Sequence, residues 1–254
     1  MELNFKKYGN AGEHLIILHG LFGMLDNWHT LGGKFAEKYQ VWLVDQRNHG
    51  KSPHSDDFNY EILADDLKHF LANQHIEKAN IIGHSMGGKT AMQFALTYPE
   101  KLDKLIVVDI APKAYNSHHD EILDALQSLD LNKIERRSDA EEMLSAKIPQ
   151  PAVQQFLLKN LGREADGYKW KMNLPALVEN YDKIIGDVSS ENIYNGPTLF
   201  IRGAESHYIL EEDIPVIKAQ FPHAEFVTFD GVGHWVHAQV PDLFFETVLR
   251  FLNS

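Results

Sequence analysis

One stretch constrains the fold of this chain more than any other: residues 79–91, which read Ala-Asn-Ile-Ile-Gly-His-Ser-Met-Gly-Gly-Lys-Thr-Ala. Its first part, Asn80 to Gly83, is short and mostly apolar and ends in glycine, as expected of a buried strand. From Gly87 onward the apolar residues follow the spacing of a helix. The turn between strand and helix matches the G-x-S-x-G pattern of a nucleophile elbow, with Ser85 at its centre.

The elbow pattern has a physical reason. A sharp strand-to-helix turn forces Ser85 into a strained backbone conformation and projects its hydroxyl above the sheet. Side chains two residues to either side would collide, so glycine is needed at Gly83 and Gly87. The following helix directs its free N–H groups and the positive end of its dipole at the same point. The motif therefore predicts Ser85 as a nucleophile.

The same letters also satisfy a phosphate-binding pattern. Gly83-x-x-x-x-Gly88-Lys89-Thr90 has the G-x-x-x-x-G-K-[ST] spacing, which likewise occurs between a strand and a helix. The apolar run 105–109 ends in an aspartate that could hold magnesium. The motif alone therefore leaves open a serine hydrolase and a magnesium-dependent nucleotide hydrolase.

Composition narrows the classes of function. A chain of 254 residues suits one large α/β domain with room for an insertion. Its net charge of -12 argues against nucleic acid as a partner, and no apolar run approaches the length of a membrane span. The absence of cysteine excludes a thiol nucleophile, a thiolate zinc site and disulfides. The histidines lack paired ligand spacing, so we expect no metal and no cofactor. We expect a cytoplasmic protein without membrane insertion.

Predicted strands and helices alternate along most of the chain. This alternation predicts the α/β class, with a mostly parallel central sheet flanked by helices on both faces. The predicted strands are 3–8, 14–18, 41–44, 80–83, 105–108, 198–201 and 225–229, and helices are expected over 27–39, around 62–71, from 87, near 215–220 and over 241–252.

Residues 113–180 break the alternation. The region is charged and helix-rich, with helices expected over 118–131, 139–148 and 151–161, and no continuous apolar strand. We predict a helical cap over 113–180, inserted in a core formed by 1–112 and 181–254.

Four short motifs in order carry a family resemblance: His19-Gly20, Asp45-x-Arg47-x-x-Gly50-x-Ser52, the elbow, and Gly233-His234. Together they resemble the α/β-hydrolase superfamily over essentially the whole chain, and the detail at 19–23, 27–28, 45–50 and 109–112 looks like the bacterial YbfF-type esterases. A phosphate-loop enzyme normally carries its loop after the first strand, whereas several strands precede it here. The resemblance therefore favours the hydrolase.

The resemblance implies roles for further residues. His234, on the loop after the last strand, is the expected general base, since the order nucleophile, acid, histidine is that of this fold. The backbone N–H groups of Met86 and Leu21 are the expected oxyanion hole. The loop that carries Arg47 is expected to be structural.

The acid is the least certain member of the site on sequence grounds. Many relatives carry it a few residues beyond the strand 198–201, where this chain has Glu205 and then Ser206. One strand earlier, Asp109 lies at the carboxyl end of its strand, and the resemblance to YbfF-type esterases also points there. We predict Asp109 as the acid, with Ser206 as an auxiliary hydrogen-bond partner.

The sequence thus predicts a serine hydrolase that cleaves a carboxylic ester or a thioester such as acyl-CoA. Its partner is a small-molecule acyl substrate. The remaining alternatives are a C–C bond hydrolase or a perhydrolase on the same fold, the nucleotide hydrolase, and a non-catalytic ligand receptor. Fold alone does not give the substrate.

Overall fold

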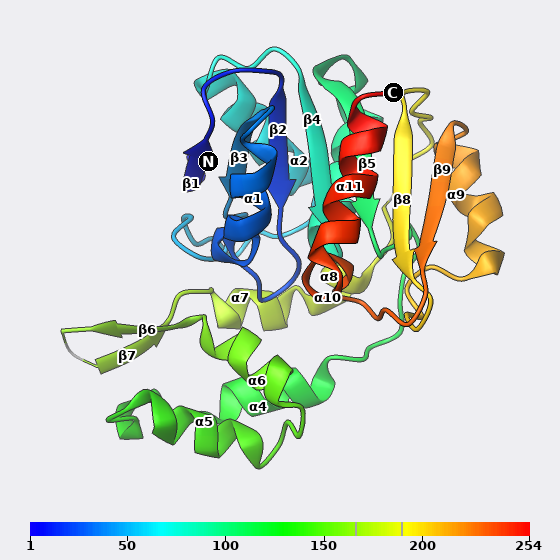
Figure 1. The fold of residues 1–254 in the computed structure, drawn as a ribbon. Coiled ribbons are helices and arrows are strands. Elements are labelled where there is room, and N and C mark those ends of the chain that lie inside the picture. The colour runs from blue at the N-terminus through cyan, green and yellow to red at the C-terminus, as the bar shows by residue number, and fades with distance from the viewer. Residues whose placement is uncertain (166, 189) are drawn as a thin grey trace.

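A seven-stranded sheet forms the centre of the computed structural model, which describes residues 1–165, 167–188 and 190–254 (Figure 1). The strand order is β1-β3-β2-β4-β5-β8-β9, and every neighbouring pair is parallel except β1 with β3 at the edge. The predicted mostly parallel sheet is confirmed. The strands are β1 (Phe5–Tyr8), β2 (His14–Leu18), β3 (Gln40–Val44), β4 (Ala79–His84), β5 (Leu102–Val108), β8 (Thr198–Gly203) and β9 (Ala224–Phe229).

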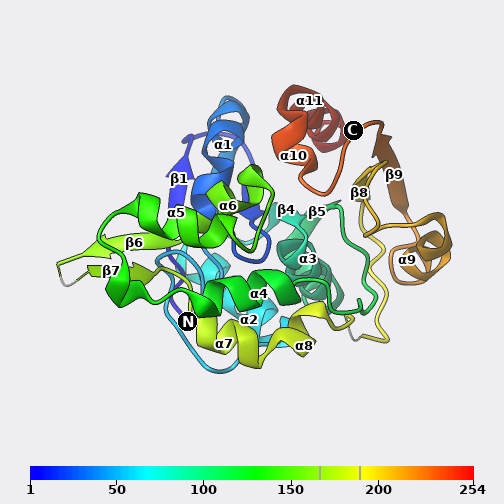
Figure 2. The same cartoon turned by 90° about the horizontal axis from the view of Figure 1, so that it is seen from below.

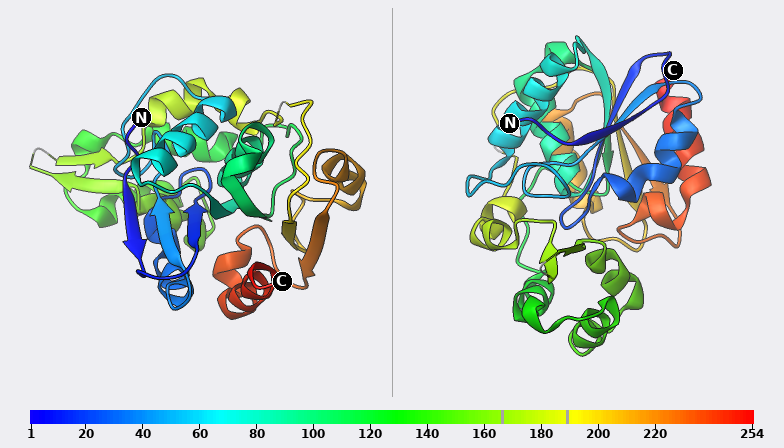
Figure 3. Two further views of the ribbon diagram at one scale, coloured as in Figure 1. Left: turned by 90° about the horizontal axis from the view of Figure 1, so that it is seen from above. Right: turned by 90° about the vertical axis from the view of Figure 1, so that its left-hand side faces the viewer.

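Helices cover both faces of this sheet. In Figure 3, α1 (His29–Phe35) and α11 (Pro241–Leu252) lie on one face, and α2 (Tyr60–Asn73), α3 (Met86–Thr97) and α9 (Ile214–Gln220) lie on the other. The central strands β4 and β5 are buried along almost their whole length, so they read as apolar runs. Two hydrophobic clusters, one on each face, fill the layers between helices and sheet.

The helix predicted over 27–39 is shorter than expected. A 3-10 turn, η1 (Leu25–Trp28), precedes α1, which ends at Phe35. The paired glycines Gly32 and Gly33 weaken the helix, because glycine is a poor helix former. Gly32 nevertheless suits the fold: a Cβ there would lie 3.1 Å from the Leu43 side chain, so its absence lets α1 pack closely on β3.

The segment between β5 and β8 lies beyond the carboxyl ends of the strands (Figures 1 and 2). We call residues 113–185 of this segment the insertion; it ends beyond the predicted cap, residues 113–180, because α8 follows α7 closely. Its elements are α4 (Asp120–Ser128), α5 (Arg137–Ser145), α6 (Pro151–Leu158), β6 (Leu161–Glu164), β7 (Gly167–Trp170), α7 (Leu174–Glu179) and α8 (Tyr181–Ile185).

The hairpin of β6 and β7 was not predicted, although it agrees with the expectation that this region contains no continuous apolar strand. The helix predicted to reach Leu161 ends at Leu158, and Leu161 begins β6 instead. Each strand of the hairpin has four residues of mixed polarity, mostly half-buried or exposed. Such strands carry no apolar run, so sequence periodicity does not reveal them.

A third hydrophobic cluster joins the insertion to loops of the core. Its members include Leu126, Leu144 and Leu157 from the insertion together with Phe22 and Met86 from the core. Hydrogen bonds reinforce this contact: the Asn160 side chain donates to the Phe22 carbonyl at 2.7 Å. Within the described residues, none of the helices is both long and apolar enough to span a bilayer.

Candidate active site

Ser85 lies at the turn between β4 and α3 in a conformation that serine rarely adopts. Its φ is 52° and its ψ is -120°. A Cβ on Gly83 would lie 2.2 Å from the Gly87 carbonyl oxygen, and one on Gly87 would lie 2.6 Å from the Leu18 oxygen. Both glycines are therefore required by close backbone contacts, as the elbow motif demands. A strained backbone at a position held by its surroundings is common at reactive sites.

Asp109 and His234 meet beside the elbow. Asp109 follows β5, is fully buried, and has a φ of 52°. Its Oδ2 accepts a hydrogen bond from His234 Nδ1 at 2.8 Å, and its Oδ1 accepts one from the Gly203 N–H at 3.1 Å. The Ser206 hydroxyl also donates to Oδ2. Glu205 is exposed, and its backbone N–H donates to the Val232 carbonyl.

Residues other than Asp109 also contact His234. The Tyr208 ring stacks on it with centroids 4.0 Å apart, and His118 Nε2 bonds the Tyr208 hydroxyl at 2.5 Å. His84 Nε2 donates to the His234 carbonyl oxygen at 3.0 Å. The orientation of the imidazole is thus fixed by stacking and by backbone contacts as well as by Asp109.

The loop after β2 approaches the elbow closely. A Cβ on Gly20 would lie 2.9 Å from the His84 ring and 3.2 Å from the Ser85 Cβ, so glycine is needed for this approach. Leu21 and Met86, whose N–H groups were the predicted oxyanion hole, both line a small hollow next to Ser85. Met86 is the first residue of α3, where backbone N–H groups have no helical partner.

A cavity of about 350 Å³ opens in front of Ser85. Its lining is mostly apolar and comes from several separate parts of the chain, including the elbow residues His84 and Ser85. The core contributes the loop from His19 to Trp28, the insertion contributes Val153 and Phe156 of α6, and the last loop contributes His234 and Trp235. Ser85 and His234 both line this cavity. In the part of the chain that the structure describes, their side chains are not hydrogen-bonded to each other. Such a pocket suits an apolar ligand that presents one polar group to the elbow.

His119 is a cavity residue that sequence reasoning missed. It lines both the main cavity and the small hollow, and its Nδ1 is 2.8 Å from the Tyr181 hydroxyl. Burial lowers the pKa of His119 to about 3. Its position in the polar run Asn-Ser-His-His-Asp carries no motif, so nothing local in the sequence indicates its place.

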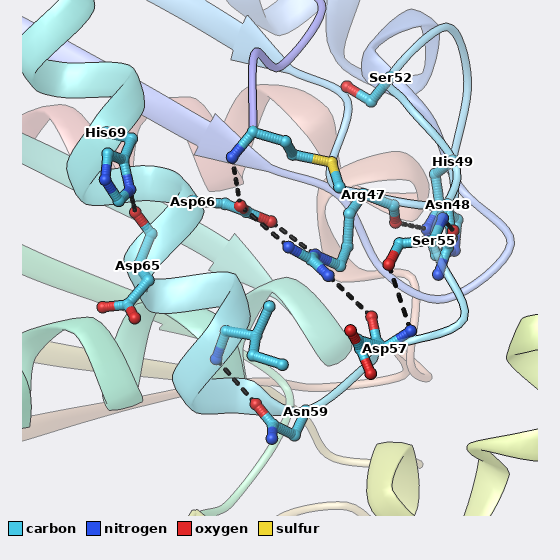
Figure 4. Close-up of polar contacts among 12 residues, drawn as sticks. Arg47, Asn48, His49, Ser52, Ser55, Asp57, Asn59, Asp65, Asp66 and His69 are labelled. Atoms are coloured by element: carbon cyan, nitrogen blue, oxygen red, sulfur yellow. Dashed lines mark hydrogen bonds and ion pairs between the residues drawn. The ribbon is translucent and has the colours of Figure 1, made fainter.

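Figure 4 shows that side chains of the loop after β3 contact other parts of the core. The Arg47 guanidinium is bidentate to Asp66, with Nε to Oδ2 at 2.6 Å and Nη2 to Oδ1 at 3.0 Å. Its Nη1 donates to the Asp57 carbonyl at 2.7 Å. Ser52 donates to the Asp45 carbonyl at 2.6 Å. None of these five residues lines the main cavity.

The position of Lys89 argues against a phosphate-binding loop at residues 83–90. A phosphate-binding lysine needs a free ammonium, but Lys89 is 1% exposed and its Nζ donates to three backbone carbonyls, those of Lys113, Ile185 and Gly186. Within 1–165, 167–188 and 190–254, no three acidic or histidine side chains are grouped to hold a metal ion.

Four buried histidines, three of which line the main cavity, should make the protein sensitive to acid. Burial lowers the pKa of His19 to about 4, those of His49 and His237 to about 3, and that of His84 well below its usual value. Hydrogen bonds fix the orientation of the His19 ring: its Nδ1 donates to the Gly20 carbonyl while its Nε2 accepts from the Gln46 N–H.

The free energy of unfolding should decrease as the pH falls below about 6.5. In this range histidines bind protons in the unfolded chain, whereas the buried histidines of the folded chain stay neutral. Each buried histidine contributes about 1.4 kcal/mol of lost stability per pH unit between its unfolded and folded pKa values. Urea unfolding at about pH 7 and about pH 5 measures the loss. His49→Gln should reduce it, whereas the exposed His69→Gln should not. Equal losses in both variants would contradict the assignment.

Comparisons with known proteins identify the class. The family described as "alpha/beta hydrolase fold" matches residues 13–241, and the chain belongs to this family. More particularly, it is an α/β hydrolase of the YbfF type: it is 37% identical to Esterase YbfF of Escherichia coli over 261 residues, covering 100% of both chains. The predicted resemblance is confirmed.

Two further relatives extend the comparison. An sn-1-specific diacylglycerol lipase of Danio rerio is 37% identical over 263 residues, covering 100% of this chain and 83% of the lipase. A solved structure of a marine microorganism esterase is 45% identical, covers 98% of this chain and 99% of that one, and superposes with a TM-score of 0.97.

Proposed function

We propose that this protein is a serine esterase that cleaves carboxylic esters through an acyl-enzyme on Ser85. The observation that carries the proposal is the Asp109–His234 hydrogen bond of 2.8 Å beside a strained serine in an apolar cavity. Relatives named as an esterase and a diacylglycerol lipase, similar over this whole chain, support the same chemistry.

In the proposed mechanism the Ser85 hydroxyl attacks the ester carbonyl carbon and its proton passes to His234 Nε2. The Asp109 carboxylate accepts a hydrogen bond from the Nδ1–H of His234. This bond fixes the tautomer of His234 and stabilises the imidazolium that forms. The N–H groups of Leu21 and Met86 bind the developing oxyanion. The C–O bond to the alcohol then breaks, and His234 returns the proton to that oxygen. Water, activated by His234, attacks the acyl-enzyme and releases the carboxylic acid.

The proposal assigns residues 113–180 to a cap over the acyl group. Open α/β sheets bind ligands beyond the carboxyl ends of their strands, and α6 contributes Val153 and Phe156 to the cavity at that end. An acyl chain in this cavity would replace water at apolar side chains, which favours binding. Thioesters such as acyl-CoA undergo the same acyl transfer and belong to the proposed substrate range.

Labelling with a fluorophosphonate tests the proposal. This reagent phosphonylates a serine only when a base and an oxyanion hole activate it. Peptide mass spectrometry should find the adduct on Ser85, and hydrolysis of esters and acyl-CoAs of graded acyl length should be lost in proportion to labelling. Unlabelled Ser85 in folded protein, or labelling without loss of hydrolysis, would refute the serine esterase.

A further inference from the structure

Two chain crossings connect the insertion to the core, and they lie against each other. The outgoing crossing is residues 112–115 and the returning crossing is residues 184–188. The Tyr115 N–H donates to the Ile185 carbonyl at 2.9 Å, and the Val188 N–H donates to the Pro112 carbonyl at 2.8 Å. The two crossings therefore form one paired base from which the insertion extends.

Lys89, on α3, binds both crossings at once. Its Nζ donates to the Lys113 carbonyl of the outgoing crossing at 2.9 Å. It also donates to the Ile185 carbonyl of the returning crossing at 3.2 Å and to the adjacent Gly186 carbonyl. An ammonium has three protons, so all of them are used.

Groups near Lys89 act on its charge in opposite directions: two aromatic rings and a carboxylate favour the ammonium, whereas burial disfavours it. Its Nζ lies 4.7 Å from the centre of the Tyr115 ring and 5.7 Å from that of Tyr60, within the range of cation–π attraction. The Tyr60 hydroxyl donates to the Ile184 carbonyl at 2.5 Å and so supports the returning crossing. Burial lowers the pKa of Lys89 to about 7, and the Asp187 carboxylate opposes that shift.

The helix that carries Lys89, α3, begins directly after Ser85. Lys89 follows Ser85 by one helical turn, and its N–H donates to the Ser85 carbonyl at 3.1 Å. A small hollow is lined jointly by Ser85, Lys89 and Tyr115. The elbow and the first turn of α3 therefore carry both the proposed reactive serine and the lysine that binds the base of the insertion.

We propose that Lys89 is a positioning residue that clamps both crossings and thereby sets the cap over the acyl pocket. This inference rests on the proposed function. Lys89 contacts none of the reacting atoms, so it acts on substrate binding through the cap. It also gives a role to the lysine of the apparent phosphate loop.

Loss of the clamp should lower the fraction of molecules in which the cap is correctly placed. The apparent affinity for a ligand falls in proportion to the binding-competent fraction, whereas the chemistry in the occupied site does not change. KM for long-chain esters should therefore rise with little change in kcat. Short acyl esters, which reach fewer cap side chains, should be less affected.

Lys89→Met tests the clamp, with Lys104→Met as a matched control. Methionine keeps an unbranched apolar side chain and removes the charge and all three donors. Lys104 also donates to three backbone carbonyls, those of Phe251, Leu252 and Ser254, but at the C-terminal end of α11. The control thus loses the same kind of contact away from the insertion.

Two readouts are compared in the full-length variants. Hydrogen exchange at the Tyr115 and Val188 amides should accelerate about tenfold in Lys89→Met, because hydrogen bonds from a charged group are lost. KM for long-chain esters should rise about fivefold. Lys104→Met should leave both unchanged. Unchanged exchange at both crossings, or a loss confined to kcat, would overturn the proposal.

The exchange measurement does not depend on catalysis. If the wild-type protein hydrolyses no ester, the proposed function fails while the exchange comparison still decides the clamp. If Lys89→Met does not fold, Lys89→Gln provides the same test, because the amide keeps a polar side chain but removes the charge and has only two N–H donors for the three carbonyls. Exchange at Tyr115 and Val188 identical to that of the wild type in Lys89→Gln would then count against the clamp.

Discussion

Replacing Ser85 with alanine is expected to abolish ester hydrolysis, lowering kcat by on the order of a millionfold, as loss of a triad nucleophile does. Without the hydroxyl no acyl-enzyme can form, and only binding and oxyanion stabilisation remain. Alanine keeps the Cβ that the elbow already accommodates, so packing is preserved. Single-turnover and steady-state kinetics with an activated ester measure the loss.

A serine distant from the elbow provides the control for this experiment. Ser128 lies in α4, where its hydroxyl donates to the Ala125 carbonyl at 2.8 Å. Ser128→Ala should keep wild-type activity and show that loss of one hydroxyl is harmless elsewhere. If folded Ser85→Ala retains a tenth of the wild-type rate, acyl transfer through Ser85 is refuted.

Replacing Asp109 with asparagine should lower kcat about ten-thousandfold, the effect seen when a serine protease loses its orienting acid. An amide in this position can donate to Nδ1, which would hold His234 in the tautomer that cannot accept the Ser85 proton. The Asp109 carboxylate is fully buried and bonded to Ser206, Gly203 and His234, so no other group can replace it. Steady-state kinetics and thermal unfolding together separate the catalytic loss from a loss of fold.

Two neighbouring substitutions sharpen this test. Ser206→Ala removes one donor to Asp109 and should cost about tenfold in kcat, as one hydrogen bond to a charged group does. Glu205→Gln changes an exposed carboxylate and should have little effect. A severe loss in Glu205→Gln combined with an active Asp109→Asn would transfer the role of the acid to Glu205.

Sequence predicted well those features for which burial or close backbone contact allows only a few residue types. The central strands are apolar because both faces are covered, and the elbow needs glycines because its backbone segments touch. Asp109 was harder, because the acid can follow either of two strands and only the tertiary fold decides which carboxylate reaches His234. The structure joins Asp109 to His234 and leaves Glu205 exposed.

Other features were hidden from the sequence because they depend on long-range contacts. The β6–β7 hairpin has no apolar periodicity, and the close packing of α1 on β3 depends on Gly32 facing Leu43 in a separate part of the chain. His119 belongs to the cavity only because the insertion folds over the elbow. The role of Lys89 could not be read locally either, since its partners lie 24, 96 and 97 residues further along the chain.

The cavity walls have a consequence for how such a protein can diversify. Ser85, Asp109 and His234 follow strands of the rigid sheet, whereas α6 contributes its wall from a separate segment. Substitutions at Val153 or Phe156 should therefore change the shape of the cavity without disturbing the backbone that carries the proposed catalytic residues. Substrate preference should therefore be able to change through substitutions on α6, in nature or in the laboratory, while Ser85, Asp109 and His234 keep their positions.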